Sequence, residues 1–353
     1  MSSPVSTLTI TRPDDWHLHL RDGAELASVL GYTARAFARA IVMPNLRPPV
    51  TTVKQAARYR DRIRAALPAG MSFEPLMTLY LTDTTSPAEI DRAAASGFVA
   101  GVKLYPAGAT THSDAGVTSL ARCAAAFERM EERDVVLQVH GEATGDDVDP
   151  YDRESVFIER ELAPLVARHP GLRVVLEHVT TRAGVEFVRA GAGKVAATIT
   201  PQHLLYNRGA MFRGGLRPHL YCLPILKRER DREALVAAAI AGDPRFFLGT
   251  DSAPHERYAK ETACGCAGVF SAPAALELYA RAFEEAGRLD RLESFSSFNG
   301  ADFYRLPRNQ GRVTLERRAW TVPESLPFGA GEIVPMCAGE TLAWQLRDAG
   351  GAP

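Results

Sequence analysis

The chain has 353 residues, 46% of them hydrophobic, which suits one large α/β barrel or two smaller domains. Lysine and arginine total 41 against 42 acidic residues, and this net charge of −1 excludes a global field that would attract nucleic acid or an anionic membrane. The sequence has no secretory-signal pattern, no apolar run of membrane-spanning length and only five sparse cysteines, which together predict a cytoplasmic protein with reduced thiols.

Eight short apolar runs, often rich in β-branched residues, recur along the chain, and a polar turn follows each one. They predict strands at 8–10 continuing towards His19, 40–43, 73–81, 99–104, 135–139, 174–177, 195–199 and 246–249. Segments with helical spacing lie between them, at 24–38, 53–66, 86–95, 120–132, 153–167, 181–189 and 228–241. The sequence therefore repeats one strand–helix unit.

This alternation favours a closed α/β barrel of the (β/α)8 TIM type over an open sheet. No linker rich in proline, glycine and serine divides the chain, so we predict a single domain over residues 1–353. From about Val313 the periodicity weakens and proline and glycine become more frequent, which predicts a C-terminal tail that wraps the barrel.

Titratable residues gather at one kind of position, the carboxyl end of a predicted strand. They come from five strands: His17 and His19 from the first, then Lys103, His140, His178 and Asp251. In a parallel barrel these strand ends meet at one face, where active sites are built. We therefore expect the six side chains to converge.

Each of these residues alone has an ordinary structural explanation. A His-x-His pair occurs by chance, a lysine in an apolar strand often packs its stem inward from the surface, and an aspartate after a strand often caps a helix. Their shared position favours a functional role instead. Among the other histidines, we predict His169 at a surface helix end and His112 in a polar loop, and we expect neither His203 nor His219 to contact metal.

The residue types suit zinc, which prefers imidazole nitrogen and carboxylate oxygen and keeps a position open for water in catalytic sites. Four histidines and an aspartate exceed the needs of one open site, which predicts a pair of metal ions joined by an anionic bridge. Burial lowers the pKa of a lysine, and the neutral amine of Lys103 can add CO2 to become a bridging carbamate.

Six motifs surround these residues: Trp16-His17-Leu18-His19-Leu20-Arg21-Asp22, Met43-Pro44-Asn45, Gly101-Val102-Lys103-Leu104-Tyr105-Pro106, Gln138-Val139-His140-Gly141-Glu142, Glu177-His178 and Gly249-Thr250-Asp251-Ser252-Ala253-Pro254-His255. In this order, over essentially the whole chain, they resemble the amidohydrolase superfamily and, within it, the shorter bacterial dihydroorotases. The first strand begins so near the N-terminus that we expect none of the flanking β-sandwich that hydantoinases, allantoinases and longer dihydroorotases build partly from N-terminal sequence.

The resemblance implies a hydrolase that reversibly cyclises N-carbamoyl-L-aspartate to L-dihydroorotate in pyrimidine biosynthesis. It implies that one zinc ion is held by His17, His19, Asp251 and carboxylated Lys103, and a second by Lys103, His140 and His178. A hydroxide bridging the two ions would be the nucleophile, and Asp251 would carry its proton to the leaving nitrogen.

The resemblance also implies the substrate contacts. Arg21, Asn45 and His255 would bind the substrate carboxylate, with Arg21 supplying a planar fork. The remaining expected contacts are His19, His140 and the main chain of Leu223 and Ala267. The small polar loop 106–113 resembles a mobile lid, and we expect the hydroxyl groups of Thr110 and Thr111 to bind carbamoyl-aspartate.

Two alternatives remain open at this point. The first is another cyclic amidohydrolase acting on a hydantoin-like ring, against which Arg21, Asn45 and His255 argue, because a ring without a carboxylate leaves them unpaired. The second is a catalytically silent barrel that serves as a partner of a pathway enzyme, against which the complete ligand set argues. The resemblance further implies a homodimer with a small-molecule substrate.

Overall fold

The structure is a computed structural model that describes residues 5–263 and 265–347. Its centre is a sheet of eight parallel strands, each hydrogen-bonded to the next in chain order. The strands are β2 (Asp14–Leu18), β3 (Arg39–Val42), β4 (Glu74–Tyr80), β5 (Val99–Leu104), β6 (Val136–Val139), β7 (Val174–Leu176), β8 (Val195–Ile199) and β9 (Phe246–Leu248). Main-chain hydrogen bonds from Asp251 to His17 (2.9 Å) and from His19 to Ser252 (3.1 Å) join the last strand to the first. The predicted (β/α)8 TIM barrel is confirmed.

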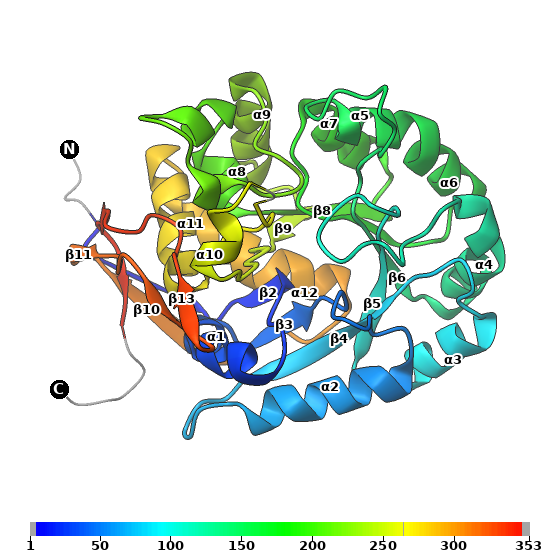
Figure 1. Cartoon of the computed structure of the whole chain (residues 1–353), viewed down its shortest axis with the longest axis horizontal. Coiled ribbons are helices and arrows are strands. Elements are labelled where there is room, and N and C mark those ends of the chain that lie inside the picture. Colours follow the sequence, from blue (N-terminus) through cyan, green and yellow to red (C-terminus); the bar gives the residue numbers. More distant parts are fainter. Residues whose placement is uncertain (1–4, 264, 348–353) are drawn as a thin grey trace.

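A ring of helices surrounds the strands (Figure 1). The α-helices are α1 (Gly23–Ala36), α2 (Val53–Ala65), α3 (Pro87–Ala95), α4 (Ala124–Arg133), α5 (Arg153–Phe157), α6 (Ala163–Arg168), α7 (Arg182–Ala190), α8 (Pro201–Leu205), α9 (Glu229–Ile240), α10 (Arg257–Lys260), α11 (Ala275–Glu285) and α12 (Asn299–Phe303). The 3-10 helices are η1 (Leu120–Cys123), η3 (Arg208–Phe212), η4 (Pro218–Leu220), η5 (Ala272–Ala274) and η6 (Leu289–Arg291), and η2 (Ile158–Leu162) and η7 (Ser294–Phe298) are π-helical. The seven predicted helices are present, although η2 interrupts the one expected at 153–167.

The prediction for the first strand is wrong in one respect. Residues 8–10 do not run into the barrel but belong to a separate strand, β1 (Thr7–Thr11). Pro13 lacks an N–H donor and cannot continue a ladder, and the Arg12 amide donates to Gly311 O (2.7 Å) instead. The N-terminal residues 7–11 therefore form a strand of a small sheet outside the barrel.

The C-terminal segment supplies the partners of β1. Strand β1 pairs antiparallel with β10 (Arg312–Glu316), which also pairs with β15 (Gln345–Leu346). Two further antiparallel pairs join β11 (Trp320–Thr321) to β14 (Thr341–Leu342) and β12 (Leu326–Phe328) to β13 (Gly331–Ile333). These strands lie at one side of the barrel, next to the N-terminal segment (Figure 1).

A β-bulge in β2 decides which of its side chains face the barrel interior. Asp15 pairs with Ala40 and Leu18 with Val42, so Trp16 and His17 together lie opposite the single residue Ile41. Trp16 joins an apolar cluster with Ile41. His17 lies nearer the carboxyl end of the strand, among titratable groups.

The amino-terminal end of the barrel interior is apolar. Its buried cluster contains Trp16, Ile41, Leu76, Val136, Val175, Ala196 and Phe247 from seven strands. Helix α12 lies against this end, and Tyr304, just after it, stacks on Trp16 with ring centroids 4.8 Å apart. A β-carbon at Gly300 would overlap the Trp16 indole, so the close approach of α12 requires glycine there.

Cys123, Cys222, Cys266 and Cys337 form no disulfide, and Cys264 lies outside the described residues. Within residues 5–263 and 265–347, none of the helices combines the length and apolar character needed to cross a bilayer.

Candidate active site

Three of the predicted ligands meet where the first and last barrel strands join. His17 lies in β2, His19 follows it, and Asp251 follows β9. Asp251 Oδ1 lies 3.4 Å from His17 Nε2 and 3.1 Å from His19 Nε2. One ligand atom from each residue lies within 4.8 Å of the others, a spacing that suits one metal ion.

The two later histidines form a second group beside the first. His140, after β6, places Nδ1 3.2 Å from Nε2 of His178, which lies just beyond β7. The rings of His178 and His17 have centroids 5.0 Å apart, so the two groups are adjacent. All of these rings are buried.

Lys103 comes from β5 and is fully buried, with an exposed fraction of 0%. Its Nζ has no hydrogen-bond partner among the described residues and lies 5.1 Å from the Tyr105 ring centroid. Burial lowers the pKa of Lys103 to about 8, although the charges of Glu177 and Asp251 oppose this shift. Its charge also contributes to lowering the pKa values of His17 and His178.

The outer nitrogens of three histidines are held by side-chain oxygen atoms. His17 Nδ1 lies 2.8 Å from Glu177 Oε2, His19 Nδ1 lies 2.9 Å from Asn45 Oδ1, and His140 Nε2 lies 3.0 Å from Glu142 Oε2. Such partners fix the tautomer and ring orientation of a histidine ligand. Neither Glu142 nor Glu177 was predicted as a site residue, although each lies one or two residues from a predicted ligand.

The electrostatics favour neutral rings beside an ionised carboxylate. Burial, together with the Lys103 charge, holds the pKa values of His17 and His178 well below the usual range. Burial alone would raise the pKa of Asp251, but the hydrogen bond with His19 and the positive charge of Lys103 hold it below the usual range, so the carboxylate is ionised. Neutral imidazole and ionised carboxylate are the forms that bind zinc. The donor set fits a metal pair, and so does the Lys103 amine, which lacks a hydrogen-bond partner in the part of the chain that the structure describes.

Three non-glycine residues of the site have left-handed backbone conformations. The φ angles are 62° at Arg21, 39° at His178 and 45° at Asp251. Residues other than glycine rarely adopt these backbone angles, and such strained residues cluster at functional sites. The turn at His178 follows the inward-facing Glu177, so two consecutive residues reach the site.

Arg21 and His255 lie together at the edge of the same cluster. Arg21 Nη2 lies 2.8 Å from His255 Nε2, and Arg21 Nε donates to Pro254 O (2.8 Å). Burial, with the charges of Arg21 and Lys260, lowers the pKa of His255 to about 2, so this ring is neutral at physiological pH. A buried guanidinium beside a neutral ring has the chemistry to bind an anion.

The remaining predicted contacts line the same small cavity, which also includes Tyr105: they are Asn45, Thr110, Thr111, Leu223 and Ala267. Thr111 Oγ1 donates to Ala267 O (3.3 Å), and Asn45 Nδ2 donates to Thr111 O (3.2 Å). The loop 106–113 therefore closes over the cluster. The cavity measures about 20 Å³, room for one water, so some of its lining groups have to move before a larger molecule enters.

The histidines outside the cluster have other partners. His169 lies at the end of α6, as predicted, but the prediction that it is at the surface is wrong. It is 9% exposed because its ring packs beside Phe127, and its Nδ1 lies 3.3 Å from Glu131 Oε2. His203 contacts Thr200 Oγ1 and Pro224 O, and His219 contacts Glu261. His112 lies in the loop, 3.2 Å from Asn45 O.

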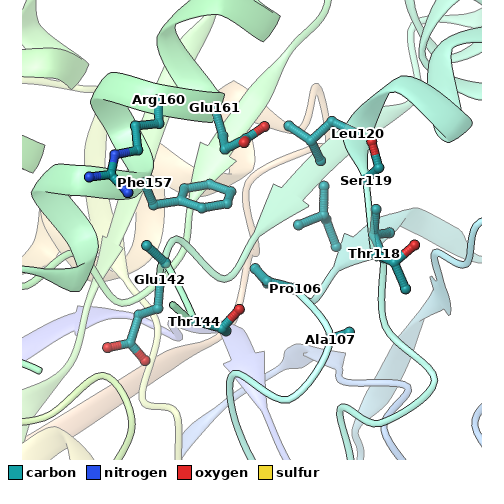
Figure 2. A pocket seen from close by; sticks show the side chains of 13 residues that line it. Pro106, Ala107, Thr118, Ser119, Leu120, Glu142, Thr144, Phe157, Arg160 and Glu161 are labelled. Atoms are coloured by element: carbon teal, nitrogen blue, oxygen red, sulfur yellow. The ribbon is translucent and has the colours of Figure 1, made fainter. Parts of the chain in front are cut away.

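A separate cavity of about 330 Å³ lies beside the site. Phe157, Arg160 and Glu161 form one side of it, and Thr118, Ser119 and Leu120 form the other (Figure 2). Glu142 borders this cavity, but its carboxylate turns away towards His140 (Figure 2). None of the predicted site residues lines it.

Comparison with known proteins adds independent findings. Residues 10–341 match the profile described as the Amidohydrolase family. Dihydroorotase of Laribacter hongkongensis is 68% identical over 97% of this chain and 99% of its own length, and that of Methylobacillus flagellatus is 64% identical over 98% and 100%.

Solved structures agree. Dihydroorotase of Campylobacter jejuni superposes with a TM-score of 0.90 at 35% identity, covering 98% of this chain and 99% of that one. The Saccharomyces cerevisiae dihydroorotase in complex with 5-fluoroorotic acid gives 0.90 at 31% identity, covering 99% and 100%. L-hydantoinase of Arthrobacter aurescens gives 0.79 at 17% identity over 96% and 82%, which shows a shared fold.

Proposed function

Because the chain belongs to the dihydroorotase branch of the amidohydrolase family, and is a hydrolase acting on a cyclic amide, we propose that it interconverts N-carbamoyl-L-aspartate and L-dihydroorotate in pyrimidine biosynthesis. One observation carries the proposal: buried Arg21, paired with half-buried His255, lies beside the cluster of His17, His19 and Asp251. That arrangement matches a cyclic amide that bears a carboxylate.

The proposed metal centre contains two zinc ions. His17, His19 and Asp251 would hold one, His140 and His178 the other, and carboxylated Lys103 would join them. When bound, the ions would acidify water and polarise the amide carbonyl. The Lys103 amine is buried and has no hydrogen-bond partner among the described residues, which supports the modification, because the oxygens of a carbamate would bind the metal ions instead.

Asp251 is the proposed proton carrier. In the hydrolytic direction it accepts a proton from the attacking water and delivers it to the departing ring nitrogen, and ring closure reverses these steps. The nearby imidazoles of His17 and His19 hold its carboxylate in position. Glu177 and Asn45 in turn orient those two rings through their outer nitrogens.

The substrate carboxylate is proposed to bind Arg21, Asn45 and His255. Arg21 is itself fixed, because Nε is bonded to Pro254 O and its main-chain carbonyl accepts a hydrogen bond from the Tyr59 hydroxyl (2.5 Å). A preorganised fork loses little entropy when it binds. The other proposed substrate contacts are His19, His140, Thr110, Thr111 and the main chain of Leu223 and Ala267.

Dihydrouracil, which is dihydroorotate without the carboxylate, provides a direct test. We expect zinc-loaded protein to prefer dihydroorotate by at least about a thousandfold in kcat/KM, because a ring without the carboxylate leaves buried Arg21 unpaired. Arg21→Met should remove most of that preference, because it should lower kcat/KM for dihydroorotate and leave kcat/KM for dihydrouracil nearly unchanged. Comparable wild-type rates on the two rings would contradict the proposal and favour a hydantoinase-like enzyme.

A further inference from the structure

Lys260 is a buried lysine outside the proposed metal centre. It is the last residue of α10 and has an exposed fraction of 4%. Burial lowers the pKa of Lys260 to about 8, so the ammonium form still prevails at neutral pH. An ammonium group has three N–H donors and no acceptor, so a buried one needs several oxygen partners.

Main-chain carbonyl groups of two separate segments supply these partners. Lys260 Nζ donates to Tyr221 O (2.9 Å), Cys266 O (2.8 Å) and Gly268 O (2.5 Å). The Gly268 amide also donates to Tyr221 O (3.0 Å). One ammonium group therefore ties the chain at Tyr221 to the chain on both sides of Ala267.

The tied segments form a wall of the site cavity. Leu223, Ala267 and Gly268 line that cavity. Ala267 O lies 3.0 Å from His255 Nε2 and 3.3 Å from Thr111 Oγ1, so it contacts both the anion-binding pair and the closing loop. A shift of the Cys266 or Gly268 carbonyl, which Lys260 holds on the two sides of Ala267, would move Ala267 and both of its contacts.

Resting on the proposed function, we propose that Lys260 is a positioning residue for substrate binding, which holds the main chain of Leu223 and Ala267 in place beneath the substrate ring. Its charge also acts on Arg21 and His255, and it adds to the positive field where the substrate carboxylate would bind. Because Lys260 touches no reacting atom, its loss affects KM more than kcat.

Lys260→Met tests this role, and Lys227→Met is the matched control. Lys227 is also buried, at 3% exposure, but among the described residues its Nζ donates to one carbonyl, that of Ile225 (3.1 Å), and it does not line the cavity. We expect Lys260→Met to raise KM for L-dihydroorotate about tenfold or more while kcat changes less than about threefold. Lys227→Met should lower Tm and leave KM unchanged.

Hydrogen exchange provides a readout that does not depend on activity. Lys260→Met should speed amide exchange in peptides containing Tyr221–Leu223 and Cys266–Gly268, and Lys227→Met should not speed exchange in the second peptide. If Lys260→Met does not fold, Lys260→Arg replaces it, and its KM should lie between those of the wild type and a full loss, since a planar fork cannot reach all three carbonyls.

The outcomes separate the two proposals. An inactive zinc-loaded wild type would overturn the proposed function, and the exchange data would then decide on Lys260 alone. A wild-type KM in the Lys260 variant, an equal rise of KM in Lys227→Met, or unchanged exchange in both peptides would overturn the positioning role.

Discussion

The two ends of the barrel interior are built from the same strands but from opposite kinds of side chain. At the amino-terminal end Trp16, Phe247 and Tyr304 pack against one another with ring centroids 4.8 to 6.2 Å apart. At the carboxyl end Lys103 and Asp251 lie buried among histidines. The first arrangement stabilises the fold, whereas the second buries groups that prefer water and so costs stability.

Every second residue of a strand points into the barrel, and along one strand these inward side chains change from apolar to polar to titratable. Val136 belongs to the apolar cluster, Gln138 is buried midway and bonds to Tyr304, and His140 reaches the site. In β9, the eighth barrel strand, Phe247 belongs to the apolar cluster, and Asp251, three residues after the strand ends, reaches the site. A substitution at one end should therefore affect stability and at the other activity.

The largest effect should come from Lys103→Met at the carboxyl end. We expect kcat/KM for dihydroorotate to fall at least about a thousandfold, about 4 kcal/mol of transition-state stabilisation. Stability without metal should be unchanged or higher, because the variant removes a buried amine that has no hydrogen-bond partner among the described residues. Steady-state kinetics and the Tm of chelator-treated protein measure both. A lower Tm in the absence of metal would contradict the comparison.

Phe247→Ala at the amino-terminal end should do the reverse. The phenylalanine is fully buried against Trp16 and Tyr304, and its truncation should cost about 3–5 kcal/mol of unfolding free energy. Urea unfolding followed by circular dichroism measures this loss. The folded fraction should keep kcat/KM within about threefold. A selective loss of activity without destabilisation would show that the two ends are not separable in this way.

The smallest effect concerns His203, which is buried near the carboxyl end on α8. Burial lowers its pKa from 6.5 to about 4, so the unfolded chain takes up its proton first as the pH falls. This histidine should therefore cost up to about 3 kcal/mol of stability as the pH falls from about 6.5 towards 4.

His203→Gln tests this effect through the Tm of chelator-treated protein measured between pH 6.5 and 4. The Tm of the variant should fall less over this range than the Tm of the wild type. Stability at pH 7.5 should differ between them by far less than at low pH. An equal fall of Tm in the two proteins would show that His203 does not cause the loss of stability at low pH.

Much of this arrangement follows from sequence alone. Short apolar runs that alternate with helical segments predicted the barrel, and the ends of those runs placed Lys103, His140 and His178 at the carboxyl ends of strands. The predictions failed where the chain departs from regular strand geometry. The bulge that turns both Trp16 and His17 inward, and the break at Pro13 that separates β1 from β2, depend on pairing with distant segments.

Other features were hidden for a related reason. The π-helix η2 interrupts a regular helical pattern, and the buried contacts of His169 arise from tertiary packing rather than local composition. Lys260 carries no motif, since its partners are main-chain carbonyls whose residue types are irrelevant. Residue types indicate side-chain chemistry, but they do not indicate which main-chain carbonyls bind a buried ammonium group.

The central claim is tested most directly by assaying the purified, zinc-loaded protein in both directions while measuring bound zinc. We predict about two zinc ions per chain, ring opening of L-dihydroorotate at alkaline pH and ring closure of N-carbamoyl-L-aspartate at acidic pH. Folded protein with two zinc ions that converts neither compound would contradict the account.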